Sequence, residues 1–140
     1  MNVRILTSRD ASVLDRVADD VFDGPVVPSL AAEFLADPRH YICVAIEDGL
    51  VVGFASAVRY VHPDKPSALW INEVGVSPRF QRRGVGKAVM SHLLAHAGAE
   101  GCREAWVLTD RDNGAARALY RSVGGSESDA GVMVTFALEA

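Results

Sequence analysis

A short glycine-containing segment in the middle of the chain has the residue types needed to bind a phosphate group. It reads Gln81-Arg82-Arg83-Gly84-Val85-Gly86 and follows the strand-like run Trp70–Val76. Glycine adopts positive φ without steric cost, so the segment can curl tightly. The run Val85–Ala99 is rich in Ala, Leu, Val and Met, which predicts a helix. The first N–H groups of a helix have no intrahelical partner and lie at the positive end of its dipole. This segment therefore predicts a seat for a phosphate or pyrophosphate.

Basic side chains surround the predicted seat and would donate charge-assisted hydrogen bonds to phosphate oxygens. They are Arg79, Arg82, Arg83 and Lys87. The spacing of the glycines differs from the Gly-x-x-x-x-Gly-Lys-Ser/Thr pattern of a P-loop and from the Gly-x-Gly-x-x-Gly pattern of dinucleotide-binding folds. The alternative to a phosphate seat is an ordinary glycine-rich turn that begins a helix.

The pattern Gln81-x-x-Gly84-x-Gly86 resembles the acetyl-CoA signature of the GNAT superfamily of N-acetyltransferases, which is Gln/Arg-x-x-Gly-x-Gly/Ala. The segment Val74-Gly75-Val76-Ser77-Pro78 lies directly upstream. In the resembled family this strand ends in a bulge, and the pantetheine arm of CoA pairs with the backbone exposed there. Gly75, inside a β-branched run, fits such a bulge because bulges often contain glycine.

A second signature follows near the end of the chain. The segment Asn113…Ala118-Leu119-Tyr120-Arg121-Ser122-Val123-Gly124-Gly125 is similar to the family pattern Asn-x-x-Ala-x-x-Leu-Tyr-x-x-x-Gly-Phe. Gly125 departs from it, since an aromatic residue is usual there, and we expect this to affect the entry to the next strand rather than the chemistry. Asn113 is expected to cap the helix and to help orient the cofactor.

The resemblance covers essentially the whole chain and implies acetyl-CoA as the cosubstrate, with no metal. It implies a backbone N–H near Val76 as the donor to the tetrahedral oxyanion. The residues expected to bind the cofactor come from the strand, the loop and the last helix: Val74, Val76, Gln81, Arg82, Arg83, Gly84, Val85, Gly86, Lys87, Asn113 and Tyr120.

Tyr120 and Glu73 are the predicted catalytic residues. A phenol with a pKa near 10 could protonate a departing thiolate whose acid has a pKa of about 8.5, and the alternative is that the Tyr120 ring only packs on the sheet. Glu73 is the candidate base. An alkylamine and a carboxylate differ in pKa by about 6 units, so Glu73 would need a relay through water or an acceptor amine of low pKa. Attraction of a cationic substrate is the equal alternative for Glu73.

Acidic residues stand where an amine could approach, and they are expected to bind the substrate: Asp23, Glu73, Asp110 and Asp112. Asp23-Gly24, Tyr60-Val61-x-Pro63, Trp70-Ile71-x-Glu73-Val74 and the position of Asp110 together look like the aminoglycoside 3-N-acetyltransferase branch. The resemblance therefore implies acetylation of the 3-N amine of an aminoglycoside. The alternatives are acetylation of a protein N-terminus, a lysine or a small metabolite amine, and a non-catalytic acetyl-CoA sensor.

The hydrophobic periodicity predicts the elements that would position these residues. The predicted helices are Ala11–Val21, capped by Ser8 or Asp10, and Ser29–Ala36, Val85–Ala99 and Asn113–Ser122. The predicted strands are Val3–Leu6, Tyr41–Ile46, Leu50–Tyr60, Ala68–Val76, Glu104–Thr109 and Gly131–Leu138. With the resemblance, this order implies an α/β (α+β) GNAT fold. We expect a mixed, mostly antiparallel sheet of about six or seven strands, flanked by about four helices and splayed between the fourth and fifth strands.

Composition limits the function classes. The 140 residues fit one domain, 1–140, and the net charge of −4 argues against a nucleic-acid partner. No stretch approaches the ~20 apolar residues that cross a bilayer, and the first residues lack the long apolar segment and the cleavage site of a signal peptide. The two isolated cysteines imply neither a zinc cluster nor a disulfide framework. We expect a cytoplasmic enzyme that acts on a small-molecule amine without membrane contact, with a homodimer as the prior.

Overall fold

The computed structural model of the protein describes residues 1–139 and contains a mixed five-stranded sheet. The strand order β1-β2-β3-β4-β5 follows the sequence. The first four strands pair antiparallel, and β4 and β5 pair parallel because helix α2 connects them. The strands are β1 (Asn2–Ile5), β2 (His40–Glu47), β3 (Leu50–Tyr60), β4 (Ala68–Val76) and β5 (Glu104–Val107).

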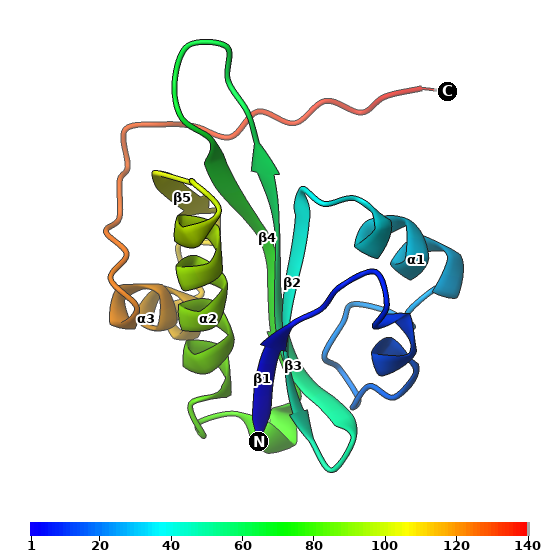
Figure 1. The fold of residues 1–140 in the computed structure, drawn as a ribbon. Coiled ribbons are helices and arrows are strands. Elements are labelled where there is room, and N and C mark those ends of the chain that lie inside the picture. The colour runs from blue at the N-terminus through cyan, green and yellow to red at the C-terminus, as the bar shows by residue number, and fades with distance from the viewer. Residues whose placement is uncertain (140) are drawn as a thin grey trace.

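Helices cover both faces of the sheet. Figure 1 shows α2 (Val85–Ala99) and α3 (Gly114–Ser122) on one face, and α1 (Pro28–Ala36) with the 3₁₀ turn η1 (Ala11–Asp15) on the other. A second 3₁₀ turn, η2 (Pro78–Phe80), leads from β4 to the loop before α2. None of the helices in residues 1–139 is long and apolar enough to cross a membrane.

Helix α2 provides the largest apolar surface against the sheet. Its buried side chains recur at helical spacing and face β2 and β3. They are Val85, Val89, Met90, Leu93 and Ala97. The first of them, Val85, is both a core residue and the first residue of the helix. Burial of α2 therefore fixes the position of the loop that precedes it.

The helix predicted over Ala11–Val21 is wrong, because only Ala11–Asp15 is helical and it is a 3₁₀ turn. The Asp10 carboxylate does not cap it and instead accepts from the Thr7 N–H at 2.7 Å. The chain then becomes extended: Val17 forms a parallel bridge with Val51, and the Val51 N–H donates to the Arg16 carbonyl at 2.9 Å. This segment, which contains β-branched residues, therefore pairs its backbone with β3 instead of continuing a helix.

The predicted splay between β4 and β5 is present, but the bulge beside it is not at Gly75. Only the first four residues of β4, Ala68 to Ile71, have partners on β5. The register between β3 and β4 shifts between Ser56/Glu73 and Ala57/Ile71, which leaves Asn72 as the extra residue. The bulge and the loss of β5 pairing therefore meet at Asn72, and the edge of β4 beyond it is open.

The strand predicted over Gly131–Leu138 is also wrong, and the sheet within residues 1–139 has five strands rather than six or seven. Helix α3 ends in a Schellman motif: Gly124 has φ 99°, its N–H donates to the Arg121 carbonyl, and the Gly125 N–H donates to the Tyr120 carbonyl. The hydrophobic contact that usually accompanies this motif is missing because Gly125 has no side chain. The departure from the family pattern at Gly125 thus coincides with the loss of the next strand.

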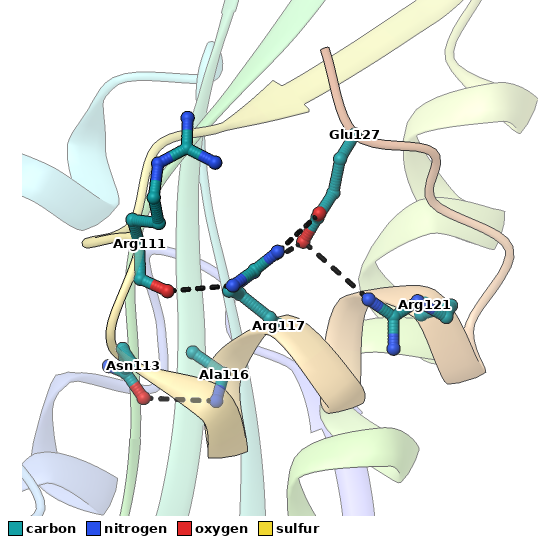
Figure 2. Close-up of polar contacts among 6 residues, drawn as sticks. All are labelled: Arg111, Asn113, Ala116, Arg117, Arg121 and Glu127. Atoms are coloured by element: carbon teal, nitrogen blue, oxygen red, sulfur yellow. Dashed lines mark hydrogen bonds and ion pairs between the residues drawn. The ribbon is translucent and has the colours of Figure 1, made fainter. Parts of the chain in front are cut away.

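An ion pair holds the start of the C-terminal tail against α3. Figure 2 shows Glu127 accepting from Arg117 through both carboxylate oxygens, at 2.7 and 2.8 Å. Arg117 also donates to the Arg111 carbonyl at 2.7 Å, and Arg121 lies 3.8 Å from Glu127. The arginines lower the pKa of Glu127, chiefly through the hydrogen bonds from Arg117. Figure 1 shows residues 128–139, in orange to red, as an extended segment that belongs to no helix or strand.

Gly75 is required by close packing rather than by its φ angle. A Cβ at this position would overlap the Val21 carbonyl oxygen and lie 2.9 Å from the Phe54 ring. We expect Gly75→Ala to lower the free energy of unfolding by about 1–3 kcal/mol, measured by urea denaturation. In Gly98→Ala the new Cβ meets no heavy atom within 4 Å. This control lies in a helix and should be neutral or more stable by up to about 1 kcal/mol. Equal stability of the two variants would contradict the packing argument.

Candidate active site

The loop before α2 is curled by two left-handed residues, Arg82 and Gly84, with Arg83 between them. Arg82 has φ 62° and Gly84 has φ 78°. A non-glycine residue at positive φ is strained and is often found where a ligand is held. Gly86 is not left-handed. It lies in the first turn of α2, where a Cβ would come within 3.2 Å of Leu119 on α3. The two glycines of the motif therefore have different roles: Gly84 allows the left-handed turn, and Gly86 allows α2 and α3 to pack closely.

The backbone amides of this loop are free to bind a ligand. The N–H groups of residues 82–87 donate no hydrogen bond to any other residue in the described chain, and the first intrahelical bond is from the Ala88 N–H to the Gly84 carbonyl at 3.0 Å. Among the described residues, no side chain caps the N-terminus of α2. These donors converge at the positive end of the α2 dipole, so the loop can accept an anion such as a diphosphate.

Positive side chains surround these amides. Arg82, Arg83 and Lys87 are all exposed. The Arg83 guanidinium lies 5.2 Å from the centre of the Phe80 ring, and the Arg79 guanidinium lies 5.9 Å from the centre of the same ring. The ring restricts where the Arg83 side chain can lie while leaving its N–H donors available. The predicted basic residues are therefore gathered at the start of α2.

The open edge of β4 continues from this loop. The Ser77 N–H donates to the Val52 carbonyl at 2.9 Å, so Ser77 directs its backbone groups toward β3. Alternate residues of a strand direct these groups to opposite sides. Val74 and Val76 consequently direct their N–H and carbonyl groups into the gap beside β5. Gln81 donates from its side-chain Nε2 to the Val76 carbonyl at 3.3 Å, which ties the loop to this edge.

Helix α3 brings Tyr120 and Asn113 to the same face of the sheet as α2. Tyr120 is half-buried against the core, and burial raises the pKa of its hydroxyl above the ordinary 10.0. The hydroxyl makes no hydrogen bond to another residue in the described part of the chain. Asn113 caps α3, as predicted: its side-chain oxygen accepts from the Ala116 N–H at 3.1 Å (Figure 2).

The acidic residues expected to bind substrate come from both sides of the gap. Glu73 is exposed on β4, at the residue after the bulge. Asp23 follows Val21 and Phe22, which contact Gly75 and Phe54, so its loop lies over the same strand. Asp110 and Asp112 are exposed in the loop that follows β5 and leads to α3. This arrangement presents negative charge to whatever enters between the strands.

A cluster of aromatic side chains was not expected as part of the site. Trp70 and Trp106 stack with their rings 5.3 Å apart, and the Trp106 indole N–H donates to the Tyr60 hydroxyl at 2.6 Å. Both indoles are more than one-third exposed. The register pairs Trp70 with Trp106. In the sequence, the two tryptophans of the chain fall on two predicted strands. Only the register between these strands shows that the two side chains are neighbours.

A cavity of about 550 Å³ lies elsewhere, between η1 and α1. It is lined mainly by apolar residues, among them Leu14, Val17 and Val26. It lies on the face of the sheet opposite α2 and is separate from the loop (Figure 1). None of the residues that line this cavity belongs to the loop before α2 or to β4.

Comparison with known proteins identifies the family. The family model of the Acetyltransferase (GNAT) family matches residues 12–124, which contain the loop, the splayed strand and α3. This chain belongs to the GNAT family of acetyltransferases. Its members use acetyl-CoA, and the unpaired amides at the start of α2 are of the kind that can accept its diphosphate.

Relatives with known names differ in their acceptors. The N-alpha-acetyltransferase RimI of Mycobacterium tuberculosis is 33% identical over 126 residues, which are 89% of this chain and 77% of the relative. A mycothiol acetyltransferase of Kocuria rhizophila is 37% identical over 93 residues, which are 63% of this chain but only 30% of the relative. The chain thus spans most of the first relative and less than a third of the second.

Solved structures confirm the α/β GNAT fold. An aminoglycoside acetyltransferase, meta-AAC0020 from an uncultured soil metagenomic sample, was solved with sisomicin. It matches with a TM-score of 0.81 and 18% identity, over 99% of this chain and 96% of that chain. The aminoglycoside acetyltransferase AAC(6')-Iy, solved with a bisubstrate analog, matches with a TM-score of 0.77 and 20% identity, over 98% of each chain. At these identities the likeness concerns the fold.

Proposed function

We propose that this GNAT acetyltransferase transfers the acetyl group of acetyl-CoA to a primary amine of a polycationic small molecule, with aminoglycosides as the substrate class. The observation that carries the proposal is the continuity of the free amides of residues 82–87 with the open edge of β4. The first would hold the diphosphate and the second the pantetheine arm. The thioester would then lie in the gap between β4 and β5.

The reaction needs a donor to the tetrahedral oxyanion, and the backbone of β4 supplies one in this proposal. The Val76 N–H is directed into the gap, where no strand pairs with it. An N–H aimed at a developing oxyanion contributes about 3–4 kcal/mol to transition-state stabilisation in comparable sites. The Val74 N–H lies two residues away along the same edge of β4 and would donate to the pantetheine arm.

In this proposal Tyr120 acts on the departing thiolate, but as a hydrogen-bond donor and not as the proton donor that the sequence suggested. Transfer of a proton from a phenol of pKa near 10 to a thiolate whose acid has a pKa near 8.5 is uphill by about 2 kcal/mol. Burial raises the pKa of Tyr120 further. Tyr120 therefore stays protonated and donates a hydrogen bond to the sulfur as its charge develops, rather than losing its proton outright.

The acceptor class rests on charge. Asp23, Glu73, Asp110 and Asp112 lie around the gap, and all four are exposed. A polycationic amine suits such a rim, and neighbouring ammonium groups lower the pKa of each amine, which eases its deprotonation. The likeness to aminoglycoside acetyltransferases in fold supports this choice. Acetylation at the 3-N position, a homodimer and a cytoplasmic location all stay predictions.

A second candidate acceptor is a protein N-terminus. It is favoured by the 33% identity to the N-alpha-acetyltransferase RimI over 89% of this chain. A steady-state assay that detects free thiol separates the two candidates. We expect turnover with sisomicin and none with peptides that have free N-termini. Turnover of peptides alone would select the second candidate, and acetyl-CoA binding without thiol release from any amine would select a non-catalytic sensor.

Glu73→Gln tests the role of the carboxylate on β4. If Glu73 orients a water or accepts the amine proton, we expect kcat/KM to fall roughly 10- to 100-fold, mostly through kcat. The measurement is steady-state kinetics with sisomicin. Glu33→Gln makes the same chemical change on exposed α1 and should leave both constants unchanged. A rise in KM alone would assign Glu73 to substrate attraction.

A further inference from the structure

The exposed aromatic cluster lies on the same face of the sheet as Glu73. Trp70 is opposite Val58 and Glu73 is opposite Ser56 in the register between β3 and β4. Val58 and Ser56 are two residues apart and so share a face. Side chains alternate between the two faces of a regular strand, so residues three positions apart, such as Trp70 and Glu73, would lie on opposite faces. The bulge at Asn72 adds one residue and thereby places Glu73 on the same face as Trp70.

The cluster is built as a fixed surface. The Trp106 side chain reaches from β5 across β4 to donate to the Tyr60 hydroxyl on β3 at 2.6 Å. Ala68, whose small side chain is buried, lies opposite Tyr60 in the register. The indoles of Trp70 and Trp106 stack nearly parallel, at 10°. We name this surface, made of Tyr60, Trp70 and Trp106, the indole platform.

The platform is left open by the fold. Trp70 is 40% exposed and Trp106 is 36% exposed. Figure 1 shows that α2 and α3 lie on the other face, and α1 packs over β2. Large apolar side chains that are held in one orientation yet exposed are typical of binding surfaces. The carboxylate of Glu73, on the same face of β4, gives the charge of the partner that would fit.

We infer that the indole platform binds a second cationic group of the acceptor while the amine to be acetylated lies beside Glu73. Ammonium groups bind over the faces of tryptophan rings better than over other aromatic rings. Three residues of strand separate Trp70 from Glu73, which is on the order of 10 Å. The inference rests on the proposed acetyl transfer and makes it specific: the acceptor carries at least two amines on the order of 10 Å apart.

The chain offers a direct probe, because Trp70 and Trp106 are its only two tryptophans. All indole fluorescence therefore reports on the platform. We would titrate the full chain, saturated with CoA, with four compounds: sisomicin, spermidine, cyclohexylamine and trehalose. Sisomicin has several charges and rings, and spermidine has several charges but no ring. Cyclohexylamine has one charge and a ring, and trehalose has rings but no charge.

We expect sisomicin and spermidine to change the emission in a saturable way, and cyclohexylamine and trehalose to leave it unchanged at the same concentrations. Trp70→Phe and Trp106→Phe each leave one indole as reporter. Trp70→Leu removes the aromatic face, and we expect it to raise the KM for sisomicin roughly 2- to 30-fold with kcat retained. Trp70→Phe keeps a ring and should restore part of that loss. The affinity for acetyl-CoA, measured by calorimetry, should stay unchanged in all of these variants.

The inference is overturned if the protein acetylates sisomicin but sisomicin does not change the indole emission, and if Trp70→Leu has the same KM for sisomicin as the unaltered chain. An equal response to trehalose would show stacking on sugar rings instead of cation binding and would also overturn it. It is also overturned if the full chain gives no response to any amine but deletion of residues 131–140 changes the emission, because the tail would then occupy the platform. Failure of the proposed function looks different, since no amine would release thiol whatever the emission does.

Discussion

Arg83→Glu is expected to weaken acetyl-CoA binding about 100-fold. Arg83 lies between the two left-handed residues of the loop, and its guanidinium is held 5.2 Å from the Phe80 ring. A charge-assisted hydrogen bond to a phosphate contributes about 1.5–3 kcal/mol, which is roughly 10- to 150-fold in affinity. The substituted carboxylate adds repulsion at a site where the free amides and the helix dipole both favour an anion. Calorimetry with acetyl-CoA measures the change directly.

The matched control for this loss is Arg103→Glu. Arg103 is exposed, follows the C-terminal end of α2, and donates its backbone N–H to the Ser67 carbonyl. It undergoes the same change of two charge units at the opposite end of the helix from the loop. We expect its affinity for acetyl-CoA to stay within about twofold. If Arg83→Glu also kept its affinity, the loop would have no part in binding the cosubstrate and the whole proposed function would fail.

Tyr120→Phe is expected to lower kcat roughly 100- to 1000-fold with little change in KM. The hydroxyl is proposed to meet the sulfur only as negative charge develops there, and such an interaction contributes to the transition state alone. Loss of a donor of this kind costs about 10²–10³ in kcat in comparable sites. The ring packs with the core and stays in the variant, so the fold should be retained.

The pH dependence gives an independent test of Tyr120. Burial raises the pKa of its hydroxyl above 10.0, so the donor is present at neutral pH and is lost only as pH rises through that raised value. We expect kcat of the unaltered chain to fall above pH 10 and that fall to be absent in Tyr120→Phe. Tyr41→Phe removes a hydroxyl that accepts from Arg59 and serves as the control. Normal turnover in Tyr120→Phe would leave Tyr120 with a packing role only.

Local sequence patterns were sufficient for most of the elements. The five strands and the helices α1, α2 and α3 occur where the apolar spacing predicts them, because each depends on residues near one another in the chain. The cap of α3 by Asn113 is likewise a local interaction. The misassigned segments depend on distant partners. Val17 became extended because Val51 was available to pair with it.

The sequence by itself determined the family and the chemistry that can occur, because the Gln81-x-x-Gly84-x-Gly86 spacing and the basic residues around it are contiguous and act through backbone amides of one loop. Only the tertiary structure decided where the strands separate. The bulge at Asn72 and the end of β5 pairing after Ile71 come from the register of three strands, which no single segment encodes. That register also placed Glu73 and the two tryptophans on one face. Side-chain direction reverses at every residue of a strand, so one extra residue decides which groups can act together.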